Sequence, residues 1–121
     1  MPDVREPNMN LPIGWDPETA ESGWGESYNE AMAAIGSLSQ LSVIDRDLSS
    51  PPGSPSNGDR YIVADTASGA WEGQEGNVAV WLSHLSAWVF FEPRIGWRAY
   101  VEDEEVLTVF KAAGWSAGLS I

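Results

Sequence analysis

The sequence predicts a mainly β fold: a small antiparallel β-sheet or barrel of about five to six short strands, preceded by an extended N-terminal arm and one amphipathic helix. Two observations lead to this prediction. The 121 residues include seven tryptophans, twelve glycines and eight prolines, a composition that suits short strands joined by tight turns. After Asp59, the spacing of apolar residues changes to the period of two that is typical of strands.

Residues 1–25 predict an extended anchoring arm. Prolines recur along it, at Pro2, Pro7, Pro12 and Pro17. Each proline fixes its own φ and restricts the residue before it, which favours extended backbone. Two Gly-Trp pairs, ending at Trp15 and Trp24, predict anchor points, because an indole in a polar segment needs a pocket to cover it. That pocket lies on the same chain, on a sister chain or on another protein.

Residues 26–41 predict an amphipathic helix. Ser27 and Glu30 have the spacing of a capping box, and Gly36 weakens the C-terminal end. Apolar residues follow at helical spacing, at Tyr28, Met32, Ile35 and Leu38. This stripe predicts packing on one surface, either the β-domain or a helix bundle about an oligomer axis. The predicted anchoring and interface residues are Trp15, Trp24, Tyr28, Met32 and Ile35.

The rest of the chain divides into a turn-rich linker, residues 42–58, and a small β-domain, residues 59–121. Short runs of β-forming residues predict strands at 60–64, 78–81, 87–92, 97–101 and 106–111, with a sixth edge formed by Trp115, Leu119 and Ile121. The acidic run Glu102–Glu105 lies where a hairpin turn is expected.

Charge and composition exclude several classes of function. The formal net charge is −12 with only six basic residues, which disfavours binding to nucleic acid and to anionic membranes. No segment has the roughly 18 apolar residues of a membrane span. There is no cysteine, and the polar N-terminus lacks the features of a secretory signal. We therefore expect synthesis in the cytoplasm, with no signal peptide and no membrane insertion.

The sequence predicts no enzyme, no cofactor and no metal site. A nucleophilic triad needs a histidine beside a serine or cysteine, but the only histidine, His84, lies in a predicted turn. The run Glu102–Glu105 supplies carboxylates without the spacing of a calcium-binding loop, and we interpret it as a solvated hairpin tip.

The aromatic residues are the remaining candidates for a binding site. Aromatic faces stack on the apolar C–H patches of sugar rings, and nearby carboxylates accept hydrogen bonds from the hydroxyl groups. The candidate glycan platform comprises Trp71, Trp81, Trp88, Trp97 and Tyr100, with Trp115 as a further member. The alternative is that these side chains form the core or a subunit interface, where tryptophan is common.

Several segments together resemble a known family. They are Asn10–Trp15, Gln40–Leu48, Pro51–Pro55, Gly58–Val63, Gly69–Trp71, Ala79–Trp81, Ala87–Trp88 and Pro93–Val101. The combination resembles an uncharacterised domain family of tailed phages, prophages and gene-transfer agents, found in tail fibre, head spike and other virion proteins. This family has no agreed catalytic residues.

The resemblance implies a non-enzymatic virion structural protein, such as a tail fibre, spike or adaptor module, that contributes to assembly and host attachment. It implies self-association, by analogy as a homotrimer, and contact with tail, baseplate, portal or capsid proteins. The chain ends soon after Trp115, which favours a short spike, an adaptor or a base over a long fibre. The alternative function is a carbohydrate-binding module that recognises host surface polysaccharide through exposed Trp and Tyr.

Overall fold

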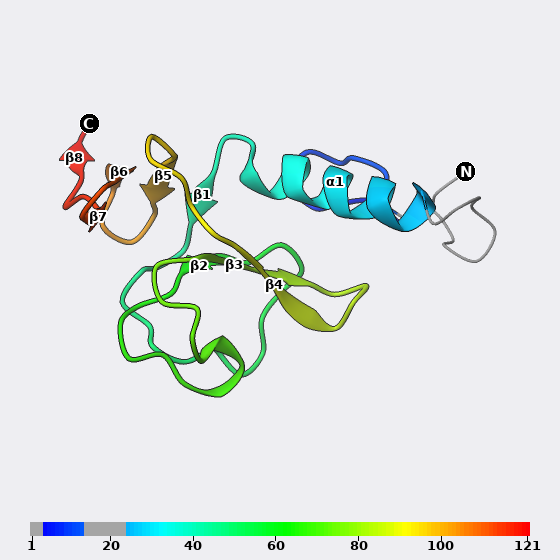
Figure 1. Cartoon of the computed structure of the whole chain (residues 1–121), viewed down its shortest axis with the longest axis horizontal. Helices are drawn as coiled ribbons and strands as arrows, with labels where there is room; N and C mark the ends of the chain where they lie inside the picture. The colour runs from blue at the N-terminus through cyan, green and yellow to red at the C-terminus, as the bar shows by residue number, and fades with distance from the viewer. Residues whose placement is uncertain (1–3, 14–23) are drawn as a thin grey trace. The chain divides into compact units, whose positions relative to one another are not determined.

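The computed structural model describes residues 4–13 and 24–121 of the chain (Figure 1). The chain divides into two compact units, residues 1–39 and residues 40–121. We call them the N-terminal unit and the β-unit and describe each by itself. The mainly β fold class is confirmed, with eight short strands in two sheets and one α-helix among the described residues.

Residues 4–13 of the predicted arm fold back on themselves instead of running extended. The amide of Glu6 donates to the carbonyl of Leu11 over 2.8 Å, and the amide of Ile13 donates to the carbonyl of Val4 over 2.9 Å. Asn10 has a positive φ of 60°, a conformation that asparagine tolerates better than most residues. These bonds close a turn at residues 6–11, and Ile13 is 1% exposed.

Helix α1, Trp24–Leu38, follows, two to three residues earlier at each end than predicted. Its buried side carries small residues, Ala33, Gly36 and Ser37, because the loop of residues 4–13 packs there. The predicted apolar stripe is on other sides of the helix, and Ile35 is 52% exposed. None of the described helices is both long and apolar enough to cross a membrane.

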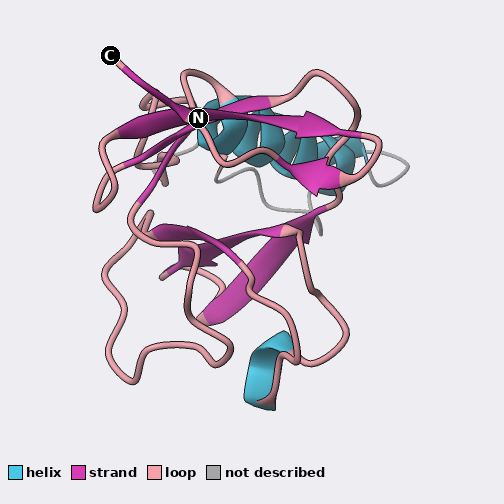
Figure 2. Ribbon diagram, turned by 90° about the vertical axis from the view of Figure 1, so that its left-hand side faces the viewer, coloured by secondary structure: helices cyan, strands magenta, loops and turns pink. Residues whose placement is uncertain are grey.

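The strands of the β-unit form two sheets, drawn in two layers in Figure 2. In the first sheet the order is β1-β5-β6-β7, with β8 also paired to β6; the second has the order β2-β3-β4. The strands are β1 Ser42–Val43, β2 Arg60–Ile62, β3 Val78–Leu82, β4 Ala87–Phe91, β5 Arg98–Val101, β6 Val106–Lys111, β7 Gly114–Trp115 and β8 Leu119–Ser120. The five predicted central strands are confirmed to within two residues at each end.

Strand β1 comes from the segment predicted to be a linker. It pairs in parallel with β5, with Ser42 opposite Tyr100 and Val43 opposite Val101. Val43 and Val101 are both 0% exposed, so burial of this pair of valines accompanies the pairing. The β-unit therefore begins near residue 40, well before the predicted boundary at residue 59.

The second sheet has apolar residues buried on both faces. Its central strand, β3, is buried at four of five positions. One face carries Tyr61 and Ala79, which form a core cluster with Val63 and Trp71; Ile44, Leu48, Ala67, Trp88 and Phe90 pack around this cluster. Trp71 lies in the short 3-10 helix Gly69–Trp71 and is 0% exposed. The segments on either side of β2, residues 44–48 and 67–71, thus contribute the side chains that pack on this face of the sheet.

Candidate functional site

The parallel pairing of β1 with β5 brings two acidic loops to one edge of the first sheet. Both strands run in the same direction, so the residues that follow Val43 and those that follow Val101 leave from the same end. The first loop contains Asp45-Arg46-Asp47, and the second is the β5–β6 hairpin turn at residues 102–105. The amide of Glu102 donates to the carbonyl of Val43 over 2.9 Å, which continues the pairing into the loops.

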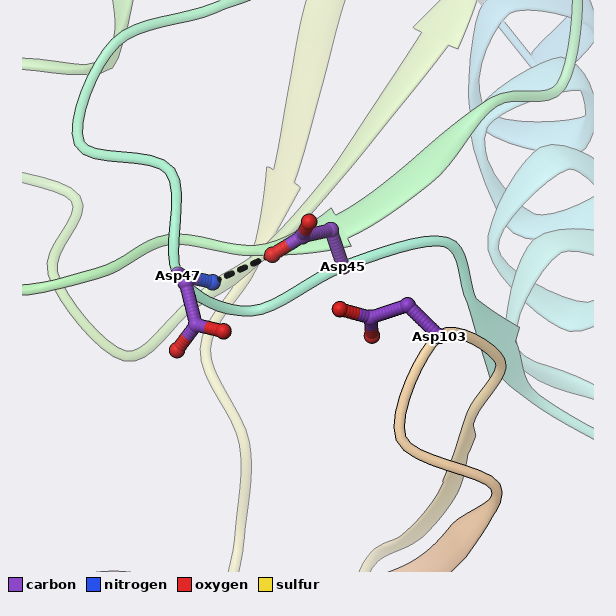
Figure 3. Close-up of side chains that lie close together, drawn as sticks. All are labelled: Asp45, Asp47 and Asp103. Atoms are coloured by element: carbon purple, nitrogen blue, oxygen red, sulfur yellow. Dashed lines mark hydrogen bonds between the residues drawn. The ribbon is translucent and has the colours of Figure 1, made fainter.

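Three carboxylates meet where these loops approach. One oxygen of each of Asp45, Asp47 and Asp103 lies within 4.8 Å of the others (Figure 3). The amide of Asp47 donates to Oδ1 of Asp45 over 2.6 Å, which orients the Asp45 side chain. Partial desolvation, then the neighbouring charges of Asp45, Glu104 and Asp47, raise the pKa of Asp103. We call these three residues the acidic triad.

Oxygen ligands of this kind suit hard cations such as Ca²⁺, which takes six to eight of them. The triad could supply three. Exposed carboxylates also gather on protein surfaces without any ion, and Asp47 and Asp103 are exposed. The triad could therefore contribute ligands to a cation site, but the clustering of these carboxylates does not by itself identify a bound cation.

Arg46 ties the two loops to the C-terminal segment. Its Nε and Nη2 donate to the two carboxylate oxygens of Glu104, each over 2.8 Å, in a bidentate ion pair. Its Nη1 and Nη2 also donate to the carbonyls of Ser116 and Ala117, each over 2.7 Å, and Nη1 lies 3.5 Å from Oγ1 of Thr108. All five guanidinium hydrogens thus have acceptors. The hydrogen bond to Glu104 is the main cause that raises the pKa of Arg46.

A cavity of about 430 Å³ opens beside Arg46, within the β-unit. Its walls come from the 46–47 loop, the end of β2 with the residues after it, the glycine turn before β3 and the β6–β7 turn. They are formed by Arg46, Asp47, Ile62, Val63, Ala64, Asp65, Gly76, Ala113, Gly114 and Trp115. We call it the Trp115 cavity. Its volume falls in the range of roughly 300–1,000 Å³ that is usual for small-molecule sites.

The indole of Trp115 is held in one orientation. Its Nε1 donates to the carbonyl of Gly76 over 2.8 Å, a bond between β7 and the loop before β3. Its ring also makes an edge contact with Phe110, with centroids 5.3 Å apart and planes at 70°. Gly114 has a φ of 115°, and its missing side chain leaves the cavity wall open beside the ring.

The other aromatic candidates do not form one surface. Trp71 is fully buried, so it cannot stack on a ligand. Trp81 and Trp88 face each other across β3 and β4, and Trp88 also makes an edge contact with Trp71. Trp97 lies just before β5 and Tyr100 lies on β5, which belongs to the other sheet. Three of the predicted residues thus belong to an aromatic cluster that reaches into the core, and the other two are elsewhere.

Among the predicted anchor residues, Trp15 lies outside the described residues. Trp24 is the first residue of α1. Tyr28 and Met32 are half-buried on that helix, and Ile35 is exposed. Of the three predicted anchor residues whose burial the structure describes, Ile35 is the one presented openly for contact with another molecule.

Sequence reasoning missed the acidic triad, Arg46 and Asp65 as members of one region. The signal was present in part, because each strand of the parallel pair ends at a valine and a charged run follows within two residues. What the sequence did not indicate was that residues 42–43 pair in parallel with residues 100–101. His84 lies in the turn between β3 and β4, as predicted, and it is not among the residues that line the cavity.

Comparison with known proteins gives a family and no function. No curated protein matches the sequence. A family model described as "Protein of unknown function (DUF2793)" matches residues 28–116, from the second turn of α1 to the residue after β7. The expectation of an uncharacterised domain family is confirmed at this level, and the link to phage particles remains a prediction. Because the match covers most of its length, the chain belongs to this DUF2793 family of unknown function.

Proposed function

We propose that this protein is a non-enzymatic structural module of a tailed-phage or phage-like particle, which joins other virion proteins and contributes to host attachment. The proposal begins from the segments that resemble tail fibre and head spike proteins. One structural observation carries it further: α1 presents an uncharged apolar face that the loop of residues 4–13 does not cover.

This face is made by Tyr28, Ala31, Ile35 and Leu38. Their spacing of three, four and three residues places them along one side of a helix, as at the a and d positions of a coiled coil. The loop of residues 4–13 covers a different side, where Nδ2 of Asn8 donates to the carbonyl of Gly36 over 2.7 Å. Ala31 and Ile35 are exposed, while Tyr28 and Leu38 are half-buried.

Charge favours helix association on this face. Glu30 is the only charged residue between Ser27 and Leu38, and it lies five positions from Ile35, about 140° around the helix. Copies of α1 can therefore meet along the apolar face without opposing carboxylates, although the whole chain carries a charge of −12. We propose a homotrimer joined by this face, which presents three β-units to the particle or to its surroundings.

The first experiment tests assembly. The mass of the full-length protein in solution is measured by light scattering for the native chain, for Ile35→Asp and for Ser27→Asp. We expect three chain masses for the native protein and for Ser27→Asp, which adds the same charge at an exposed position of the first turns. Ile35→Asp should give one chain mass with an unchanged circular dichroism spectrum. A native monomer would contradict the trimer.

The second experiment tests the location. The gene is deleted from a phage or prophage that encodes it, and the native chain or Ile35→Asp is supplied in trans. Purified particles should contain the native chain. The amount of Ile35→Asp in the particles should be strongly reduced or zero. Particles that never contain the native chain would overturn the proposed function, whatever its oligomeric state.

A further inference from the structure

We propose that the Trp115 cavity binds a sugar ring that carries no negative charge, either a neutral hexose or, more tightly, a hexosamine. This inference deepens the host-attachment part of the proposed function and rests on the β-unit alone. The predicted glycan platform does not assemble as one surface, whereas this cavity combines a fixed indole with free carboxylates.

The indole supplies the apolar contact. Because Nε1 of Trp115 is bonded to Gly76 and the ring contacts Phe110, little side-chain freedom remains to be lost when a ligand packs against it. The apolar C–H groups on one face of a pyranose ring match an aromatic surface of this kind. An ammonium group near the ring would gain a cation–π interaction as well.

Carboxylates supply the polar contacts. Asp47 and Asp65 line the cavity from two different segments of the chain, and both are exposed. Ionised carboxylates only accept hydrogen bonds, so they suit hydroxyl and ammonium groups, which donate them. The cavity is large enough for a single sugar ring with part of its hydration, at about 430 Å³.

The charge balance sets the specificity. Arg46 is the only basic residue in the described wall of the cavity, and Glu104, Thr108 and the carbonyls of Ser116 and Ala117 occupy its donors. It therefore offers no free hydrogen for a carboxylate ligand. The acidic triad adds Asp45 and Asp103 beside Asp47, so the local potential is negative. An anionic sugar such as a uronate should be rejected, and an amino sugar should be favoured.

The test uses the ¹⁵N-labelled full-length protein and the indole N–H signal of Trp115, assigned with the Trp115→Phe variant. The probes are the methyl glycosides of glucose, glucosamine and glucuronic acid, up to about 50 mM, which exceeds the millimolar Kd expected for one sugar ring. We expect saturable shifts with glucoside and glucosaminide, the latter at lower concentration, and no shift with glucuronide.

Variants test the charge argument. The double variant Asp47→Asn with Asp65→Asn should weaken glucosaminide binding about five-fold, since each exposed ion pair contributes modestly. It should also begin to admit glucuronide. The double variant Glu72→Gln with Glu92→Gln is the matched control, because it removes two exposed charges that belong neither to the cavity wall nor to the acidic triad. It should change each Kd by less than about two-fold.

Three results would overturn the proposal: a Trp115 signal that none of the three glycosides moves, glucuronide binding equal to glucosaminide binding, or a loss in the Glu72→Gln, Glu92→Gln control as large as in the Asp47→Asn, Asp65→Asn variant. These outcomes are separate from those for the proposed function, which is tested by a variant on the apolar face of α1. A protein that enters particles and ignores sugars would keep the first proposal and remove this one.

Discussion

The loop of residues 4–13 packs on α1 through a buried carboxylate, that of Glu6. The aromatic cluster of the β-unit packs on the second sheet through a buried indole, that of Trp71. In the loop, a carboxylate with no exposed surface is surrounded by backbone amides. Oε1 of Glu6 accepts from the amides of Asn8 and Met9 over 2.6 and 3.0 Å, and Oε2 accepts from Met9 and Leu11 over 2.9 and 3.3 Å. In the β-unit, an indole with no exposed surface is surrounded by rings and aliphatic groups.

The difference matters for tolerance to change. Hydrogen bonds to a buried charge are directional, so small displacements leave groups unsatisfied at high cost. The contact also needs Gly36, since a Cβ there would overlap the carboxyl group of Glu6. Apolar packing is less directional and is lost in proportion to the volume removed. The packing of the loop should therefore be lost when a single methyl group is added, whereas the aromatic cluster should be strongly destabilised only when a large side chain is truncated.

The largest effect is expected at Trp71. Trp71→Ala should lower the free energy of unfolding of the β-unit by about 3–5 kcal/mol, because it leaves a cavity among Tyr61, Val63 and Trp88. Urea unfolding followed by circular dichroism measures this. Trp71→Phe keeps most of the apolar volume and removes an Nε1–H that has no hydrogen-bond partner, so its loss should be much smaller. Equal losses would show that volume does not dominate here.

A smaller, local effect is expected at Gly36. Gly36→Ala should cost about 2 kcal/mol through overlap with Glu6, although alanine favours helix. Hydrogen exchange should show faster exchange at the amides of Asn8, Met9 and Leu11, with the β-unit unchanged. Glu30→Gly, at an exposed position of α1 outside both the covered side and the apolar face, is the control: it should cost about 1 kcal/mol and leave those amides protected. A stabilised Gly36→Ala would show that the loop adapts easily.

Next comes the ion pair between Arg46 and Glu104. The hydrogen bond from Arg46, followed by its charge, lowers the pKa of Glu104. A carboxylate whose folded pKa is lowered stabilises the fold above its ordinary pKa, and this contribution is lost as pH falls through the lowered value. Glu104→Gln should therefore cost about 1 kcal/mol at pH 7 and less in acid. Urea midpoints at several pH values test this, with Glu105→Gln as the neighbouring control. A loss that did not vary with pH would contradict the assigned role.

The smallest effect is expected at Asp103, and its sign is opposite. Its raised pKa means that the ionised form is disfavoured in the folded state, so the penalty is present above that pKa and disappears as pH falls. Asp103→Asn should thus stabilise the β-unit by about 0.5 kcal/mol at pH 7, after allowance for solvent screening. The gain should shrink in 1 M salt, where charge repulsion is screened. Destabilisation by this variant would show that the triad is not mainly repulsive.

Much of the β-unit follows from local pattern. The strands at residues 60–62, 78–82, 87–91, 98–101 and 106–111 were predicted because alternation and turn residues are properties of near neighbours. The acidic turn at 102–105 and the His84 turn follow for the same reason. The helix was also predicted, because its apolar repeat is a local pattern, but its start was not: Ser27, the predicted N-cap, is the fourth residue of α1.

The candidate site was far less predictable. Its members come from residues 46–47, 62–65, 76 and 113–115, and they meet only after β1 has paired in parallel with β5 and the two sheets have formed. A two-residue strand carries too little pattern to indicate its partner. The aromatic candidates were equally ambiguous, because tryptophan suits a core, an interface or a ligand surface.

The sequence by itself determined the β-rich class, the strand and helix positions and the acidic character of the chain. Only the tertiary structure decided that Trp71 is buried and Trp115 lines a cavity, that Gly36 and not Ile35 lies on the covered side of the helix, and that three aspartates converge. Local propensity depends on residues a few positions apart, whereas burial and charge clustering depend on which distant segments are packed together.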